Sequence, residues 1–463
     1  MVKELPRILW VAARPPLPPP PRVHSDREER EGRDDPFLFS GGAIKSQSAI
    51  AALSSVTEIE LLTFAPTDSA ALEERFRRFW SGSPVSLHLL EPGRQVGALE
   101  ALRRGRFQTS ISIEASGLGD RLQELDWEAR ENLVVLDDIV FAPLLPRYGR
   151  NALFSPHDCV SEMFRSHSRI AVSLRSALRY RVLQRIAQHY ETEFYHHALL
   201  THLVTERDRI LLQGVNPGAR YHVAPYVDEG LRASSPPVLS YTWDVVIWAN
   251  LAIPSSVRGT QAFLAAVATD PKWRHIRLAL IGRVPAANAE QALGRSSLSR
   301  LEYSPYLEDE RGQIRHAKIT VVPDIGGSGI KSRCLGLLAS RKCVACLYSQ
   351  MEGIQSICDS GAVNASSPEA LAARVKAVLR AGLYEGIAAE GHEIYAREFD
   401  KAVLHRKWID MVRRALVIRD DLQGTRPLGS RAAETRNPRR NGQQSSLPAV
   451  PERVQPVRAQ GET

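Results

Sequence analysis

Short apolar runs alternate with longer amphipathic stretches over most of this chain of 463 residues. The apolar runs have the length and composition of buried strands, and the stretches between them have the periodicity of helices. Such alternation predicts an α/β protein in which helices cover parallel sheets. We expect strands at residues 6–12, 58–63, 85–90, 133–136, 152–155, 200–204, 244–249, 276–281, 299–303, 319–322 and 343–347.

The helices expected between and after these strands include one long arginine-rich region at residues 162–199. The others are expected at residues 43–53, 69–79, 97–104, 118–131, 259–267, 286–293, 307–316, 330–339, 368–381, 384–397 and 401–417.

A proline-containing linker near residues 231–237 interrupts the alternation, which then starts again. The last stretch is dominated by Pro, Arg, Gln, Ser and Gly, a composition that predicts disorder. We therefore expect a Rossmann-like domain at residues 1–230, a second at 240–400, a C-terminal helix at 401–423 and a disordered tail at 424–463. The active site is expected in a central cleft that the two domains face.

A glycine-rich turn follows the strand at 319–322 and precedes a helix. Gly327, Ser328 and Gly329 belong to this turn, and Lys331 opens the helix. Glycines let backbone N–H groups approach a ligand, and a cation is unfavourable at a helix N-terminus unless an anion lies there. The turn therefore predicts a phosphate or diphosphate site, although it matches neither a Walker loop nor a dinucleotide fingerprint. The alternative is a tight turn whose lysine is solvated.

Two further groups of residues lie where doubly wound folds bind ligands. Gly41 and Gly42 open the first helix after the first strand, and His157 and Asp158 follow the strand at 152–155. Ligands of such folds bind just beyond the carboxyl ends of the strands. A plain helix entry at the glycines and a helix cap at His157-Asp158 are the alternatives.

The net charge of +8 suits phosphorylated substrates, anionic membranes or nucleic acids. No aromatic residues interleave with the basic ones, so we expect no nucleic-acid partner.

The arginines of the region 162–199 recur one turn apart and could lie on anionic lipid, and a solvated face is the alternative. No apolar run spans a membrane, and we expect a cytoplasmic protein that could bind the inner membrane face peripherally. The five cysteines are expected to be reduced residues of the core.

The chain resembles family 4 of the glycosyltransferases, which are retaining enzymes of the two-Rossmann GT-B architecture. The resemblance covers the chain to about residue 420. It rests on the entry through Gly41-Gly42, the segment Pro156-His157-Asp158, the segment from His222 to Asp228, the basic loop from Gly327 to Arg333, and the turn from Met351 to Ile354. It implies an enzyme that moves a sugar from a nucleotide-sugar to an acceptor that the sequence does not identify, with polysaccharide or glycolipid synthesis as an expected setting.

The resemblance also implies roles for single residues. Lys331 and Arg258 would neutralise the leaving diphosphate, helped by the backbone from Gly327 to Ile330, which includes Ser328 and Gly329. His157 and Asp158 would lie near the transferred sugar, as catalytic candidates, and Glu352 near its hydroxyl groups. We expect no cofactor besides the donor, and no essential metal because no Asp-X-Asp pair stands at a strand end.

Two departures leave an alternative open. Many family members carry two glutamates eight positions apart, where this chain has Ser328 and Gly336. The family's Gly-Arg pair after the first strand of the second domain reads Ala249-Asn250 here, whereas Arg258 keeps a second cation of the pattern. A degenerate protein of the same fold that binds nucleotide or a partner without turnover is therefore the alternative to the enzyme.

Overall fold

The computed structural model describes residues 5–13, 15–17, 41–64, 69–94, 96–171, 173–226, 240–251, 253–282, 286–294, 301–304, 314–326, 329–351, 353–357 and 360–424. The expected linker lies outside the described residues, as do the expected tail beyond Gly424, where α18 ends, and most of the helix expected at 307–316. The boundaries of the expected domains stay a prediction.

Seven parallel strands form the N-terminal sheet, in the order β3-β2-β1-β4-β5-β6-β7. They are β1 Arg7–Ala12, β2 Ile59–Phe64, β3 Val85–Leu90, β4 Asn132–Asp137, β5 Ala152–Ser155, β6 Leu200–Leu203 and β7 Tyr221–Val223. The strand order changes direction at β1, so the junction of β1 and β4 is the switch point at which doubly wound sheets bind ligands.

Six parallel strands form the C-terminal sheet, in the order β10-β9-β8-β11-β12-β13. They are β8 Trp243–Ala249, β9 Leu278–Gly282, β10 Glu302–Ser304, β11 Ala317–Val322, β12 Cys343–Leu347 and β13 Val363–Ala365. Here the switch point lies between β8 and β11. The two sheets confirm the expected fold class of two Rossmann-like units.

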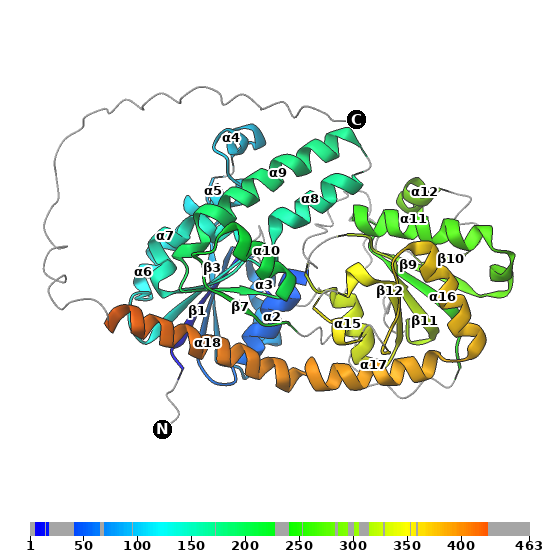
Figure 1. Ribbon diagram of the computed structural model, residues 1–463. Coiled ribbons are helices and arrows are strands. Elements are labelled where there is room, and N and C mark those ends of the chain that lie inside the picture. The colour runs from blue at the N-terminus through cyan, green and yellow to red at the C-terminus, as the bar shows by residue number, and fades with distance from the viewer. Residues whose placement is uncertain are drawn as a thin grey trace, which may run out of the picture. The chain divides into compact units, whose positions relative to one another are not determined.

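Helices connect the strands of both sheets (Figure 1). Those of the N-terminal half are α2 Gly41–Leu53, α3 Ser69–Phe79, α4 Ala98–Arg103, α5 Gln108–Glu114, α6 Leu118–Glu124, α7 Leu145–Tyr148, α8 Val160–Ile170, α9 Leu174–Glu193 and α10 Glu206–Val215. Those that follow are α11 Pro254–Thr269, α12 Ala286–Leu293, α15 Ser332–Ala339, α16 Pro368–Ala381, α17 Tyr384–Glu398 and α18 Lys401–Gly424.

Several elements differ from the expectation. The helix expected at 118–131 ends at Glu124, because Asp126 takes a left-handed conformation (φ 51°) and the N–H of Trp127 returns to the carbonyl of Leu122. This is a Schellman ending, which satisfies the last carbonyls of the helix. The sequence analysis also missed five elements, α5, α7, α10, β7 and β13.

The arginine-rich region is divided into two main helices rather than one. α8 ends at Ile170, and α9 begins at Leu174 after Ser173, whose hydroxyl accepts a hydrogen bond from the N–H of Ser176. A serine at this position is a strong N-cap, which explains why a new helix starts there. A short 3-10 helix then follows at Tyr195–His197.

The last helix, α18, contributes to the cores of both halves. Leu404 packs in a cluster with residues of the C-terminal sheet, whereas Trp408 and Met411 pack with Trp10 of β1. The Trp10 and Trp408 rings lie 6.1 Å apart. The chain therefore returns to the N-terminal sheet after completing the second one.

Candidate functional site

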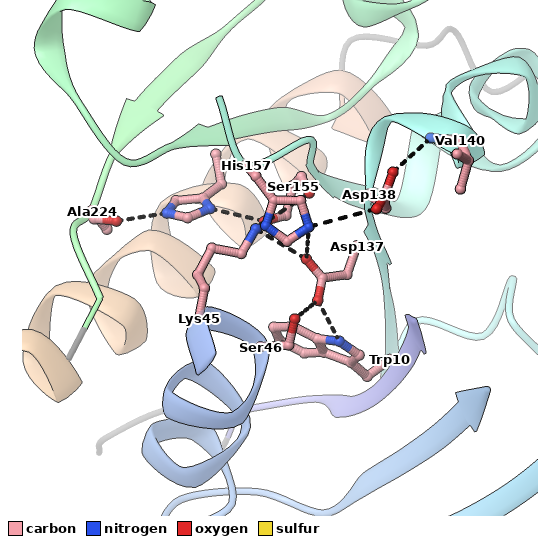
Figure 2. Close-up of polar contacts among 10 residues, drawn as sticks. Trp10, Lys45, Ser46, Asp137, Asp138, Val140, Ser155, His157 and Ala224 are labelled. Carbon is pink, nitrogen blue, oxygen red and sulfur yellow. Dashed lines mark hydrogen bonds and ion pairs between the residues drawn. The ribbon is translucent and has the colours of Figure 1, made fainter. Parts of the chain in front are cut away.

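The carboxyl edge of the N-terminal sheet brings polar residues together at the switch point. Asp137 ends β4 and pairs in register with Ala12 of β1 on one side and Ser155 of β5 on the other. α2 brings Lys45 and Ser46 to the same edge, and Figure 2 shows both side chains directed at the Asp137 carboxylate. The residues at the site thus come from four elements that are far apart in sequence.

Lys45 and Asp137 form a buried ion pair. The ammonium lies 3.1 Å from Asp137 Oδ1, and both side chains are 1% exposed. Asp137 also accepts hydrogen bonds from the Ser46 hydroxyl and, at 3.1 Å, from Trp10 Nε1. Burial alone would raise the pKa of Asp137, but the Lys45 charge and its other partners outweigh that effect and lower it. Asp137 is therefore ionised at neutral pH.

A second set of bonds continues from Lys45 along the edge of the sheet. Its ammonium donates to Ser155 Oγ (2.7 Å), and Ser155 Oγ lies 2.9 Å from His202 Nδ1. His202 Nε2 lies 2.7 Å from the carbonyl of Ala224, so this nitrogen carries the proton and Nδ1 accepts from Ser155. The Lys45 ammonium, the Ser155 hydroxyl and both ring nitrogens of His202 thus all have hydrogen-bond partners.

His157 lies beside the ion pair in a strained conformation. Its φ is 81°, and Asp138 has a φ of 140°, values that side-chain-bearing residues rarely adopt. His157 Nε2 is 3.7 Å from Asp137 Oδ1, and Nδ1 is buried without a hydrogen-bond partner among the described residues. Burial and the nearby Lys45 charge lower the pKa of His157 to about 3, so its ring is neutral at pH 7.

Two buried carboxylates hold the helix that follows His157 and Asp158. Glu191 of α9 accepts from the N–H of Ser161 (2.9 Å), and Asp208 of α10 accepts from the N–H of Cys159 (3.2 Å). Anions stabilise the exposed N–H groups at a helix N-terminus. Burial raises the pKa of Glu191 to about 7. These contacts fix the first turn of α8 and, with it, the position of the two candidate residues before it.

The loop after β11 lies against this same turn. A Cβ atom at Gly329 would come within 2.1 Å of Asp158 Oδ1, and one at Gly326 within 2.4 Å of Ser166 Oγ. Both glycines also have positive φ values. Glycine is therefore required at both positions for the loop to approach the α8 segment. Two candidates from distant parts of the sequence, Asp158 and Gly329, thus meet in the structure.

Lys331 occupies the N-cap position of α15, as the sequence predicts for the basic loop. The pKa of His167 of α8 is lowered to about 4, mainly by burial of the ring and, to a lesser extent, by the Lys331 charge. Arg333 pairs instead with Asp324 and donates to the carbonyl of Trp248 (2.7 Å). Arg333 therefore braces the ends of β8 and β11, whereas Lys331 is the cation at the start of the helix.

The remaining sequence-predicted site residues belong to other parts of the chain. Gly41 and Gly42 begin α2. Arg258 is exposed on α11, and the adjacent Gly259 lies against the carbonyl of Pro323. Ile330 is buried, and its carbonyl accepts from the Tyr226 hydroxyl (3.2 Å). Gly327, Ser328 and Glu352 lie outside the described residues. Within the described part of the chain, no group of three or more His, Cys, Asp or Glu side chains is placed to hold a metal ion.

The sequence analysis missed Lys45, Ser46, Ser155, His202 and Glu191. One indication was present, since Lys45 is the lone charged residue of the first helix, which opens with two glycines. A charged residue in such a stretch is seldom buried unless it is paired. Glu191 gave no such indication, because it lies among other charged residues.

Structural comparison finds the same architecture in proteins of distant sequence. Sucrose-phosphate synthase from Thermosynechococcus elongatus matches with a TM-score of 0.60 at 13% identity, over 89% of this chain and 99% of that chain. HepE from Anabaena, in complex with UDP, matches with a TM-score of 0.56 at 13% identity, over 88% and 99%. WaaG, a glycosyltransferase involved in lipopolysaccharide biosynthesis, matches with a TM-score of 0.55 at 12% identity, over 88% and 99%.

No protein-family model and no curated protein sequence matches this chain. At these low identities the structural matches establish the fold, which is the GT-B arrangement of two Rossmann-like units.

Removing the Lys45 charge should destabilise the protein strongly. We expect Lys45→Met to lower the free energy of unfolding by about 3–5 kcal/mol, because it leaves the Asp137 carboxylate buried without its counter-charge. Urea denaturation followed by circular dichroism measures the change. Lys45→Met combined with Asp137→Asn should recover part of the loss, and a single variant as stable as the wild type would refute the role of the pair.

Glu191 should make stability depend on pH. Its folded pKa of about 7 lies above the ordinary value of 4.5, so its contribution is fully present below pH 4.5 and is lost as pH rises through 7. Between pH 5 and 8 the wild type should therefore lose about 3 kcal/mol relative to Glu191→Gln. Melting curves across this range test the difference, with Glu193→Gln on the exposed face of α9 as the control. Parallel pH profiles for wild type and Glu191→Gln would contradict it.

Proposed function

We propose that this protein transfers a sugar from a nucleotide-sugar donor to an acceptor, with retention of anomeric configuration and without an essential metal ion. The observation that carries the proposal is the meeting of Asp158, next to His157, with Gly329 in the loop that leads to Lys331. In this proposal, the groups suited to a sugar and the groups suited to a diphosphate lie side by side. The fold shared with HepE, whose structures contain UDP and UDP-glucose, supports the same assignment.

Each group has a chemical role in this proposal. Lys331 and the first N–H groups of α15 stabilise the charge that develops on the leaving diphosphate, with Arg258 as the second cation. These cations take the place of a metal ion in that task. The neutral ring of His157 and the Asp158 carboxylate lie near the transferred sugar in this proposal. Retention is proposed from the resemblance to family 4.

Loss of the Lys331 charge should weaken donor binding without weakening the fold. We expect Lys331→Ala to reduce affinity for the nucleoside diphosphate by about ten- to a hundredfold, the value of a charge-assisted hydrogen bond. The melting temperature of the free protein should change little, because Lys331 is only half-buried at the N-cap of α15 and lies outside the core.

A thermal-shift screen of nucleotide-sugars first identifies the donor, since a ligand of the folded state raises its melting temperature. Calorimetry with the matching nucleoside diphosphate then compares wild type, Lys331→Ala and the exposed control Arg380→Gln. Transfer or hydrolysis of the donor, with the product anomer assigned by NMR, tests turnover. Absence of any nucleotide binding, or unchanged affinity in Lys331→Ala, would overturn the proposal.

We further propose that the acceptor substrate lies at an anionic membrane surface, as in glycolipid or surface polysaccharide synthesis. The start of α9 exposes Leu174 by 88% and Leu178 by 61%, next to the exposed Arg175 and Arg179. Apolar side chains beside cations suit the interface of an anionic bilayer. Among the described residues, no helix has the length and apolar character needed to cross a membrane.

Vesicle flotation should therefore show weak binding to vesicles that contain phosphatidylglycerol, and less at high salt, because salt screens exposed charges. Arg175→Gln with Arg179→Gln should reduce the salt-sensitive part, and Leu174→Ser with Leu178→Ser the remainder. Equal binding to neutral phosphatidylcholine vesicles would rule out an electrostatic contact with the membrane.

A further inference from the structure

A cavity of about 250 Å³ opens at the amino edge of the C-terminal sheet. We call it the amino-edge pocket; its lining includes Tyr241, Lys318, Arg341, Lys342, Tyr384 and Glu385. Lys318 lies near the start of β11, whereas Lys331 follows its carboxyl end. Because β11 has six residues, the strand separates the two ends by roughly 20 Å. The pocket is thus distinct from the proposed donor site.

Lys342 contributes a half-buried cation without a counter-charge. Its ammonium donates to the carbonyl of Arg315 and lies 5.6 Å from the centre of the Tyr241 ring. No carboxylate of the described residues lies within ion-pair distance of it. Burial and, to a lesser extent, repulsion by the Arg315 charge lower the pKa of Lys342 to about 8. Buried charges are normally paired, so this side of the pocket favours an added anion.

Arg341 adds a second cation in a conformation that an arginine rarely takes. Its φ is 56°, and the N–H groups of Arg341 and Lys342 return to the carbonyls of Leu338 and Leu337. This is a Schellman ending of α15, whose left-handed position usually holds glycine. Asp126 occupies the same position after α6, but aspartate tolerates it better than a long side chain does. The exposed Arg341 guanidinium has no hydrogen bond or ion pair with any described residue.

The other walls of the amino-edge pocket suit a hydroxylated ring. Tyr241 and Tyr384 meet edge to face with their centres 5.7 Å apart. Glu385 accepts a hydrogen bond from the Tyr241 hydroxyl (3.3 Å) and has further lone pairs for hydroxyl donors. The Lys318 charge is already balanced by Asp244, at 2.7 Å. The cations that remain to hold a ligand are therefore Arg341 and Lys342, on one side of the cavity.

We propose that the amino-edge pocket is a second ligand site, which binds a small phosphate monoester that carries a hydroxylated ring. Arg341 and Lys342 hold the phosphate, the two tyrosines pack against the ring, and Glu385 accepts hydrogen bonds from its hydroxyl groups. The cavity volume fits one ring with one phosphate rather than a whole dinucleotide.

Calorimetry with three probes tests the proposal on the full chain. Ribose 5-phosphate should bind, inorganic phosphate should bind more weakly because it leaves the tyrosines uncovered, and ribose should not bind at millimolar concentration. Arg341→Gly and Lys342→Met should each reduce the affinity for ribose 5-phosphate by about ten- to a hundredfold. Arg341→Gly should also keep or raise the melting temperature, because glycine removes the backbone strain.

Two further variants identify where the probe binds. Lys331→Ala, in the proposed donor site, and Arg380→Gln, an exposed control on α16, should both bind ribose 5-phosphate as the wild type does. The proposal is overturned if wild type shows no binding at millimolar ribose 5-phosphate. It is equally overturned if Arg341→Gly and Lys342→Met bind as the wild type does, or if Lys331→Ala abolishes binding.

Discussion

The buried ion pair of Lys45 and Asp137 is the interaction on which the N-terminal half depends. Withdrawing an ammonium and a carboxylate from water costs several kcal/mol per ion, and only close contact with good hydrogen bonds compensates for that cost. Here Trp10, Ser46 and Ser155 supply those bonds. The pair therefore fixes α2 against the ends of β1, β4 and β5 in one arrangement. An apolar contact of the same size would tolerate small shifts of the helix, which this network does not.

The same network ties the site to the end of the chain. His202, which completes the bonds that begin at Lys45, also packs against Trp408 of α18, with ring centres 4.3 Å apart. Arg419, further along α18, donates to the carbonyl of Asn132 and to Asn151. Since Leu404 of the same helix packs with the C-terminal sheet, α18 links the cores of both halves. The order of the site thus depends on a helix that follows the second sheet in sequence.

The fold could be predicted from the sequence because strands and helices each have a characteristic local spacing of apolar and polar residues. Runs such as Cys343–Leu347 are apolar throughout, as buried parallel strands must be, and their ends were found. Contacts between distant residues leave no such pattern. Asp158 and Gly329 were both candidates, but their approach depends on two glycines with positive φ in the loop after β11. The partners of Lys45 could not be assigned for the same reason, since Ser155 and Asp137 become its neighbours only through strand order.

Backbone strain marks where these long-range constraints act. Asp138 and His157 both hold positive φ values at the ends of β4 and β5, on either side of the Asp137 carboxylate. Such conformations cost about 1–3 kcal/mol each and persist only where the surroundings enforce them. Here the surroundings do so from two directions, because the ion pair fixes the strand ends and the carboxylates of Glu191 and Asp208 hold the first turn of α8. His157 is thus held in one conformation beside the Asp137 carboxylate by constraints from β4, β5, α9 and α10.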